Sequence, residues 1–525
     1  MKRRKFLQNT IPAAILPALI DGMSFKVLGD NPLMAAMLNA YVETDRVLVI
    51  IQLNGGNDGL NMVIPLDQYS NYFNARSNIA IPQNRVLSLT GTNTTGLHPA
   101  MTGLQSLYNN GKLRLVQAVG YPNPNFSHFR ATDIWMTASD SNVELSSGWA
   151  GRYLNDQYPN YPVGYPNTQM PDPLGIQIGS STSLTFQGPS VNTGISITSA
   201  TNFYNLINGI QDPAPPTPAG DALKYVRLVA QQSNQYSARI VGAANNVPTQ
   251  GTYPTNNSLA DQLKIVARLI KGGLKTRVYM VSLGGFDTHS VQTNTDTTTG
   301  AHATLMQRLS DAVTAFQNDL VGLGVEDRVL GMTFSEFGRR IKSNASVGTD
   351  HGAAAPLFLF GKKVNPGITG VNPTIPAVAN VNDNIPMQYD FRSVYASILQ
   401  DWFCVDNTTL QTIMLQNFQK LPVMAPSTCT GTTSVSTRDT GVSLVSNYPN
   451  PFTETTTISF TTKGGHTLIQ VMDSLGRVLR TPVDRDYQSG TYQISFDSYG
   501  LPPGVYYVRF QNGITQQVKP MLKVR

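Results

Sequence analysis

The chain has 525 residues, of which 41% are hydrophobic and 13% are charged. This composition excludes a disordered protein or a coiled coil and allows a large buried core with more than one domain. The net charge of +6 arises at the two ends, because residues 1–40 and 445–525 each carry a net charge of +3 and the middle is neutral. Nucleic-acid binding needs a concentrated basic patch, so it is not expected.

The first residues have the pattern of an export signal. A basic start precedes a short apolar segment at residues 11–20, which is too short to span a bilayer. The sequence RRKFLQ resembles a twin-arginine signal with Arg3 and Arg4 as the pair, and an ordinary secretory signal is the alternative. We therefore expect residues 1–40 to be a leader that the twin-arginine or general export machinery reads. No other segment is apolar enough to be transmembrane.

Buried strands alternate with helices between residues 41 and 424. The run RVLVIIQL at 46–53 is apolar throughout, as in a strand covered on both faces of a parallel sheet, and KLRLVQAVGY at 112–121 is similar. Apolar residues repeat with a helical period from 258 to 272, before the strand RVYMVSL. A helix at about 302–320 precedes the strand RVLGMTF. This alternation predicts an α/β fold with a doubly wound, mostly parallel sheet.

Three of the predicted strands are followed by an acidic residue, namely Asp58, Asp287 and Glu336. Ligands bind at the carboxyl ends of such strands, so these side chains are expected to converge. His289 lies two positions after Asp287 in an extended segment, and His351 adds a second imidazole. Carboxylate and imidazole ligands without thiolate favour zinc or manganese. The alternative is that the acids cap helices and turns and the histidines form ordinary hydrogen bonds.

Ser127 is the candidate nucleophile. It opens a predicted helix, SHFRATDIWM, where free backbone N–H groups and the helix dipole favour an anionic ester. A metal ion can activate its hydroxyl, and Arg130 is a candidate clamp for a phosphate or sulfate oxygen. The alternative is that Ser127 only caps the helix. His98 and His128 either support the metal ligands from behind or are structural, and we favour the structural interpretation.

The chain has two cysteines, Cys404 and Cys429, which lie 25 positions apart. In an exported protein they form one disulfide or remain two thiols, and the sequence leaves both possibilities open. Two cysteines cannot supply a thiolate metal cluster.

The composition changes after the core. Residues 425–444 are rich in Ser, Thr and Gly and read as a linker. Alternating apolar and polar residues in 445–525 predict a small antiparallel β-sandwich. Within it, YPNPF, DSLGRVL, GLPPGVYYVRF and KPMLKVR resemble, in order, the C-terminal sorting domain of the type IX secretion system of Bacteroidetes. The resemblance implies that the type IX machinery is a partner and that the protein reaches the cell surface or the medium. An adhesive or carbohydrate-binding β-domain is the alternative.

Seven segments of the core resemble a known family. LNGGNDGLN, LHPAM, FSHFRATDIW, GWAGRYL, GGFDTHSVQ, TFSEFGRR and GTDHGAAAPLFLFGKKV occur in the order seen in the sulfatase-like family called domain of unknown function 1501. That family belongs to the alkaline phosphatase superfamily, and the resemblance covers about residues 46–403. It implies an α/β/α sandwich with a site for one or two metal ions and a Ser, Thr or modified Cys nucleophile.

The resemblance also implies roles for single residues. It assigns Asp58 as the metal ligand after the first strand and Ser127 as the nucleophile. It assigns Asp287, His289 and His351 as further metal ligands, in agreement with the reading of the residues themselves.

Two features depart from the family pattern. Glu336 stands where the superfamily commonly has an Asp-His pair, so Phe337 takes the place of an imidazole. The sulfatase signature around the nucleophile is absent, so a sulfuric ester hydrolase is less expected than a phosphoric one. We expect an exported metal-dependent hydrolase of phosphate or related anionic esters. The alternative is a non-catalytic surface protein that retains the fold.

Overall fold

The computed structural model forms two compact units. One is Glu43–Cys429, and the other includes Thr430–Arg525. The predicted leader at 1–40 lies outside the described residues, as does the predicted linker at 425–444 apart from Ala425 and Cys429. The described residues are 45–199, 235–425, 429, 445–473, 477–512 and 515–524.

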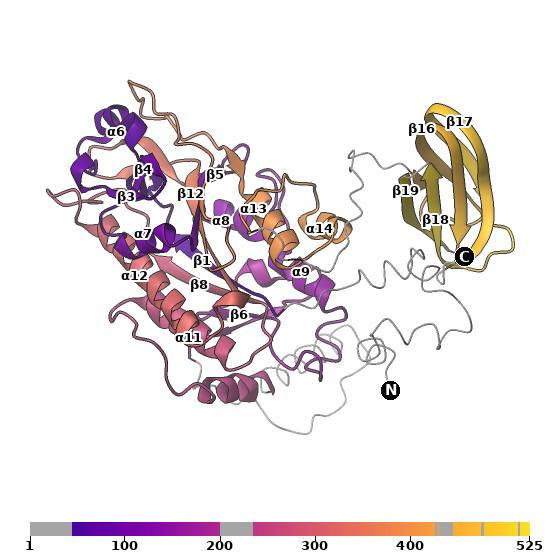
Figure 1. The fold of residues 1–525 in the computed structure, drawn as a ribbon, viewed down its shortest axis with the longest axis horizontal. Coiled ribbons are helices and arrows are strands. Elements are labelled where there is room, and N and C mark those ends of the chain that lie inside the picture. Colours follow the sequence, from indigo (N-terminus) through magenta and orange to yellow (C-terminus); the bar gives the residue numbers. More distant parts are fainter. Residues whose placement is uncertain are drawn as a thin grey trace. The chain divides into compact units, whose positions relative to one another are not determined.

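A nine-stranded sheet lies at the centre of the first unit (Figure 1). Its order is β13-β5-β12-β9-β1-β8-β6-β7, and β14 pairs with β5. Only β12 runs antiparallel to its neighbours within this sheet, so the predicted mostly parallel sheet is confirmed. The strands are β1 (Val47–Asn54), β5 (Leu113–Gly120), β6 (Gly175–Ile178), β7 (Gly194–Ile197), β8 (Val278–Gly284), β9 (Val329–Phe334), β12 (Ala355–Phe360), β13 (Gly367–Thr369) and β14 (Tyr389–Asp390).

Helices cover both faces of this sheet (Figure 1). Alternate residues of β1 point to opposite faces, as its extended backbone requires. Val47, Val49 and Ile51 pack with α7 (Thr102–Asn109), α11 (Ser258–Lys271) and α12 (Ala301–Gly322). Leu48 and Ile50 pack with α8 (His128–Thr137), α9 (Trp149–Gln157), α13 (Phe391–Ser397) and α14 (Asn407–Met414). This arrangement confirms the α/β/α sandwich, and it explains why β1 is apolar throughout.

Smaller elements adjoin the carboxyl ends of the strands. A hairpin of β10 (Arg339–Ser343) and β11 (Thr349–His351) lies between β9 and β12. A three-stranded sheet is formed by β2 (Val63–Pro65), β4 (Thr92–Leu97) and β3 (Leu87–Leu89). The short helices α5 (Gly59–Met62) and α6 (Tyr69–Arg76) follow β1. None of the helices in the described ranges has the length and apolar character that a membrane-crossing segment needs.

The C-terminal unit is antiparallel, as predicted. Its strands are β15 (Val445–Tyr448), β16 (Thr455–Met472), β17 (Val478–Asp497), β18 (Gly504–Asn512) and β19 (Thr515–Lys523). They pair as one five-stranded sheet, because the long strand β16 pairs with β15 near its start and with β18 near its end. A cluster that includes Phe460, Val471, Val508 and Phe510 is its apolar core.

The two cysteines form a disulfide at the end of the first unit. Cys404 and Cys429 are bonded, with their Cα atoms 5.5 Å apart. Arg46, just before β1, donates from Nη1 to the Trp402 carbonyl at 2.8 Å and lies 3.3 and 3.4 Å from the two sulfur atoms. The bond therefore fixes the last described residue of this unit beside the start of its central strand.

We expect replacement of both cysteines by serine to lower the free energy of unfolding of the core. For a separation of 25 residues, the loss of loop closure amounts to about 3 kcal/mol. Urea unfolding followed by tryptophan fluorescence measures it, because Trp135, Trp149 and Trp402 all lie in the first unit. Reductant should lower the stability of the wild type equally and leave the variant unchanged. A variant as stable as the oxidised wild type would contradict the expectation.

Candidate metal centre

The loops that carry the predicted ligands meet at one edge of the sheet. The register pairs Asn54 with Gly284 and Gln52 with Phe334, so β1, β8 and β9 end side by side. The hairpin β10–β11 reaches the same edge, because β12 runs in the opposite direction and starts there. Asp287 follows β8, Glu336 follows β9, and His128 opens the helix that follows β5. The convergence expected from the sequence is therefore present for these loops.

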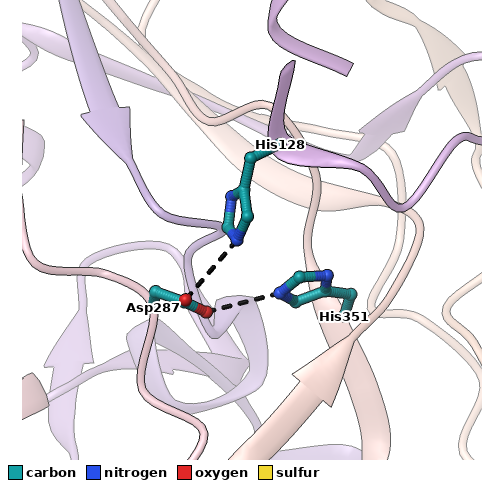
Figure 2. Close-up of side chains that lie close together, drawn as sticks. All are labelled: His128, Asp287 and His351. Atoms are coloured by element: carbon teal, nitrogen blue, oxygen red, sulfur yellow. Dashed lines mark hydrogen bonds and ion pairs between the residues drawn. The ribbon is translucent and has the colours of Figure 1, made fainter. Parts of the chain in front are cut away.

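Three imidazoles surround the carboxylate of Asp287, and we call Asp287, His128, His289 and His351 the Asp287 cluster. His128 Nε2 lies 3.5 Å from Oδ2 of Asp287, while Nε2 of His289 and of His351 lie 3.2 and 3.3 Å from Oδ1. The Nε2 atoms of His289 and His351 are 2.9 Å apart. Figure 2 shows the rings of His128 and His351 directed toward the two oxygens of Asp287.

The opposite nitrogen of each imidazole faces an oxygen acceptor. Carbonyl and carboxylate oxygens only accept, so a ring proton on Nδ1 is satisfied there, and in that tautomer the lone pair of Nε2 is open to a cation. The three pairs are His128 with Glu336 Oε1 at 2.8 Å, His351 with the Phe126 carbonyl at 2.8 Å, and His289 with Asp350 Oδ1 at 3.3 Å.

This arrangement gathers lone pairs in one place. Three Nε2 lone pairs and a carboxylate repel one another unless protons or a cation lie among them. Ligand atoms of His128, Asp287 and His351 all lie within 4.8 Å of one another, the one such group of His, Cys, Asp or Glu in the described part of the chain. Imidazole and carboxylate without thiolate are a donor set for zinc or manganese. Oxygen acceptors on the outer nitrogens orient such ligands. The cluster therefore fits a divalent cation.

Arg339, which the sequence reasoning missed, adds a positive charge to the cluster. Its side chain is fully buried, and Nη2 donates to Asp287 Oδ1 at 2.7 Å. Burial raises the pKa of Asp287, but the hydrogen bond and charge of Arg339 outweigh it and hold that pKa below its ordinary value. Asp287 is therefore ionised at neutral pH. Arg339 engages Oδ1, which leaves Oδ2 more open to a cation.

Two glycines allow the loops to approach closely. Gly55 and Gly56 have φ values of 125° and 78°. A Cβ atom would lie 2.4 Å from the Asp287 nitrogen at Gly55 and 2.2 Å from the Phe337 ring at Gly56, so neither position accepts a side chain. The backbone N–H of Gly55 donates to Glu336 Oε1 at 2.8 Å. The two glycines of the NGGND segment thus leave the space that the loops carrying Asp287 and Glu336 occupy.

His128 supplies an imidazole beside the residue that departs from the family pattern. The buried Phe337 ring lies 4.9 Å from the ring of His128 and 4.4 Å from that of His351, measured between centroids. The structure places Nε2 of His128 3.5 Å from Oδ2 of Asp287, so His128 is a candidate ligand in addition to the structural role expected from the sequence. The only signal in the sequence was its place next to Ser127. His98, by contrast, is buried and accepts from the backbone N–H of Ala100 through Nδ1.

Two predicted metal ligands lie outside the cluster. Glu336 is fully buried, and its Oε1 accepts from His128 at 2.8 Å, so it orients an imidazole. Asp58 is also buried, and its oxygens accept from Arg76 at 2.7 and 2.8 Å and from Gln292 at 2.6 Å. Both acids thus follow their strands as predicted, but Glu336 contacts the outer nitrogen of a cluster histidine and Asp58 is paired with Arg76.

The two predicted catalytic residues have different surroundings. Ser127 is exposed at the N-cap position of α8, where its side chain forms no capping hydrogen bond. Arg130 Nη2 donates to the carbonyls of Asp140, Ser141 and Val143 at 3.1, 3.3 and 2.6 Å. The structure therefore directs Nη2 of Arg130 to the loop after α8 and not to the cluster.

Family comparisons agree with both resemblances. Residues 227–411 match the model of a protein of unknown function (DUF1501), and residues 446–523 match that of a secretion system C-terminal sorting domain. The match to DUF1501 covers about a third of the chain, and the sorting domain that follows it indicates export to the cell surface or outside the cell. No curated protein matches the chain.

Solved structures with low identity also match. A protein in the alkaline phosphatase superfamily from Vibrio parahaemolyticus is 10% identical with a TM-score of 0.31, over 96% of this chain and 92% of that chain. The PsFucS1 sulfatase from Pseudoalteromonas sp. is 9% identical with a TM-score of 0.29, over 90% and 87%. The alkaline phosphatase from the Antarctic bacterium TAB5 is 10% identical with a TM-score of 0.25, over 62% and 94%.

Two further histidines are buried near the carboxyl end of β1. His302, in the first turn of α12, has Nε2 3.1 Å from Asn57 Oδ1, and its ring centroid is 6.1 Å from that of His98. Burial lowers the pKa of His302 to about 4 and that of His98 to about 3. An unfolded histidine has a pKa of about 6.5, so below that pH the unfolded chain binds more protons than the folded one.

We therefore expect the core to lose stability as the pH falls from about 6.5 toward 4, by up to about 1.4 kcal/mol per pH unit for each of these histidines. His302→Asn should reduce this slope by up to about 1.4 kcal/mol per pH unit, the contribution of one proton. Urea unfolding by tryptophan fluorescence, in chelator and between pH 7 and 4.5, measures the slope. His466→Asn is the control, because His466 is exposed and lies in the C-terminal unit. An equal slope in wild type and His302→Asn would show that His302 does not titrate on unfolding.

Proposed function

We propose that the protein is an exported metal-dependent hydrolase of phosphate or related anionic esters, with zinc or manganese as its metal. The observation that carries this proposal is the convergence of three Nε2 atoms on the carboxylate of Asp287. The ligands would be Asp287, His128 and His351, with His289 as a fourth. Such an ion would act as a Lewis acid on the ester oxygens and favour the ionised form of a nearby hydroxyl.

Residues of the chain would position the ester and the nucleophile. Ser127 directly precedes His128, and its hydroxyl makes no capping bond, so it is available for attack. In this proposal the Ser127 oxygen forms a bond to phosphorus as the bond to the leaving alcohol breaks, and water then releases phosphate from the serine. Backbone N–H groups in the first turn of α8 would favour the anionic group. Glu336 and Asp350 would keep the proton of their histidines on Nδ1 throughout.

A second candidate function is binding without catalysis. It is favoured by the position of Arg130, whose donors bind loop carbonyls, and by Phe337, which occupies the place of an expected imidazole. A protein of this kind would retain the fold and expose the cluster at the cell surface. Metal binding and ester turnover separate the two functions.

We also propose how the chain is organised for export. Residues 1–40 would be the leader read by the twin-arginine or general export machinery, and the protein would pass through the periplasm. Residues 41–424 would form the core and 425–444 the linker. Residues 445–525 would engage the type IX secretion machinery, as the match to a sorting domain supports.

Replacement of His289 by alanine tests the metal centre. Loss of a ligand should lower zinc or manganese affinity by at least about tenfold. Metal that binds the folded state raises the melting temperature, so the variant should gain about 1.4 kcal/mol less from excess metal than the wild type. In chelator the two should melt alike, because the His289 side chain is 44% exposed and packs little. If chelator leaves the wild type unmoved, the cluster is a set of ordinary hydrogen bonds.

Replacement of Ser127 by alanine tests catalysis. We expect the variant to lose turnover of p-nitrophenyl phosphate esters in the presence of zinc or manganese. Its stability should change by less than about 0.5 kcal/mol, because no capping bond is lost. Ser146→Ala is the matched control, since Ser146 is an exposed serine in the segment before α9. Full activity in Ser127→Ala would favour the binding function.

A further inference from the structure

A buried ion pair takes up the carboxylate that the family resemblance assigns to a metal. The side chains of Arg76 and Asp58 are 0% and 1% exposed. Arg76 Nη1 donates to both oxygens of Asp58 at 2.7 and 2.8 Å, and Gln292 Nε2 donates to Oδ2 at 2.6 Å. Burial raises the pKa of Asp58, but the charge of Arg76 contributes to holding it below the ordinary value. Asp58 is therefore a charged carboxylate whose two oxygens are both engaged.

Arg76 is also fixed on its other sides. Its Nη2 donates to the carbonyl oxygens of Arg340 and Ile341 at 2.6 and 2.8 Å, and its Nε donates to Ile341 at 3.0 Å. A cation approaching Asp58 would have to displace a donor and would lie within a few ångströms of this guanidinium, with little water to screen the repulsion. The neighbouring His302 is neutral at pH 7 and contacts Asn57. The surroundings of Asp58 thus favour the arginine over an added ion.

The ion pair has a structural connection to the Asp287 cluster through Gln292. The Oε1 atom of Gln292 accepts from Thr288 Oγ1 at 2.9 Å and from Thr349 Oγ1 at 3.0 Å. Thr288 lies between two members of the cluster, and Thr349 lies two residues before His351. Gln292 therefore links the ion pair to the two segments that carry the ligands. The charges of Arg76 and Asp58 neutralise each other.

We infer that Arg76 takes the place of a second cation, so that the chain binds one divalent ion, at the Asp287 cluster, and none at Asp58. This inference rests on the proposed metal dependence. The two buried arginines, Arg76 and Arg339, then have different roles. Arg76 saturates both oxygens of Asp58, whereas Arg339 engages only Oδ1 of Asp287 and leaves Oδ2 facing His128.

The number of zinc ions per chain tests the inference. The full chain would be stripped with chelator, dialysed and titrated with zinc in a calorimeter, and native mass spectrometry would count the bound ions. We expect one equivalent for the wild type. Asp287→Ala should weaken binding by at least about tenfold. The double variant Asp58→Asn with Arg76→Gln removes both charges of the pair together and should still bind one equivalent.

Two equivalents for the wild type would overturn the inference and leave the proposed function standing. Loss of zinc binding in a double variant that keeps the near-ultraviolet circular dichroism of the wild type would also overturn it, because Asp58 would then be needed for the ion. If the double variant does not fold, the count for the wild type decides alone. No zinc binding by the wild type would refute the metal dependence itself and the inference with it.

Discussion

The candidate site depends on one buried guanidinium, that of Arg339. Its Nε donates to the Gly56 carbonyl at 2.6 Å, its Nη1 to Thr349 at 2.8 Å, and its Nη2 to Phe286 at 3.1 Å and to the Asp287 carboxylate at 2.7 Å. A buried charge is tolerated only when its donors are satisfied and a counter-charge is close. These acceptors belong to the loops after β1 and β8 and to β11. Arg339 therefore fixes three segments relative to one another in satisfying its own hydrogen bonds.

The charges around the cluster are balanced in pairs, and this balance decides where a cation can bind. Glu336 and Asp350 each accept from the outer nitrogen of an imidazole, His128 and His289 respectively. These carboxylates consequently orient the two rings with Nε2 toward Asp287. Asp287 is the one carboxylate placed among the imidazoles. A divalent ion would meet three neutral nitrogens and one half-engaged carboxylate, so its charge would be incompletely neutralised and would still attract an anionic ester.

The strands and the main loops were predictable because their signals are local. A predominantly apolar run predicts a strand covered on both faces, and β1, β5, β8 and β9 are all of this kind. An acid directly after such a strand lies at the edge where ligands bind, which singled out Asp58, Asp287 and Glu336. His289 follows two positions after Asp287, whereas His351, in β11, was singled out only as a second imidazole.

Other parts of the site could not be predicted, because they depend on which partner each side chain finds in three dimensions. Arg76 lies 18 residues from Asp58, at the end of a short helix, and nothing near it in the sequence indicates a buried charge. Arg130 lies three residues after Ser127, a spacing that suggests a phosphate clamp. In the structure its Nη2 instead donates to carbonyl oxygens of the loop after α8. His128 could not be assigned from the sequence. Two neighbouring residues of a helix point in directions about 100° apart, so no rule of spacing decides which of them faces a site.

At the start of α8 the structure differs from what the local rule for helix N-caps predicts. A serine at an N-cap position ordinarily binds a backbone N–H of the first turn, and loss of that bond costs helix stability. Here the Ser127 side chain makes no such bond, while its own backbone N–H donates to Asn125 Oδ1 at 2.8 Å. The helix is held instead by buried residues such as Ile134 and Trp135. The hydroxyl of Ser127, the residue next to His128, therefore has no capping role. This helix begins without a side-chain cap beside the imidazoles of the cluster, and this is the feature that would let the Ser127 hydroxyl and the first turn of α8 serve an anion in the proposed function.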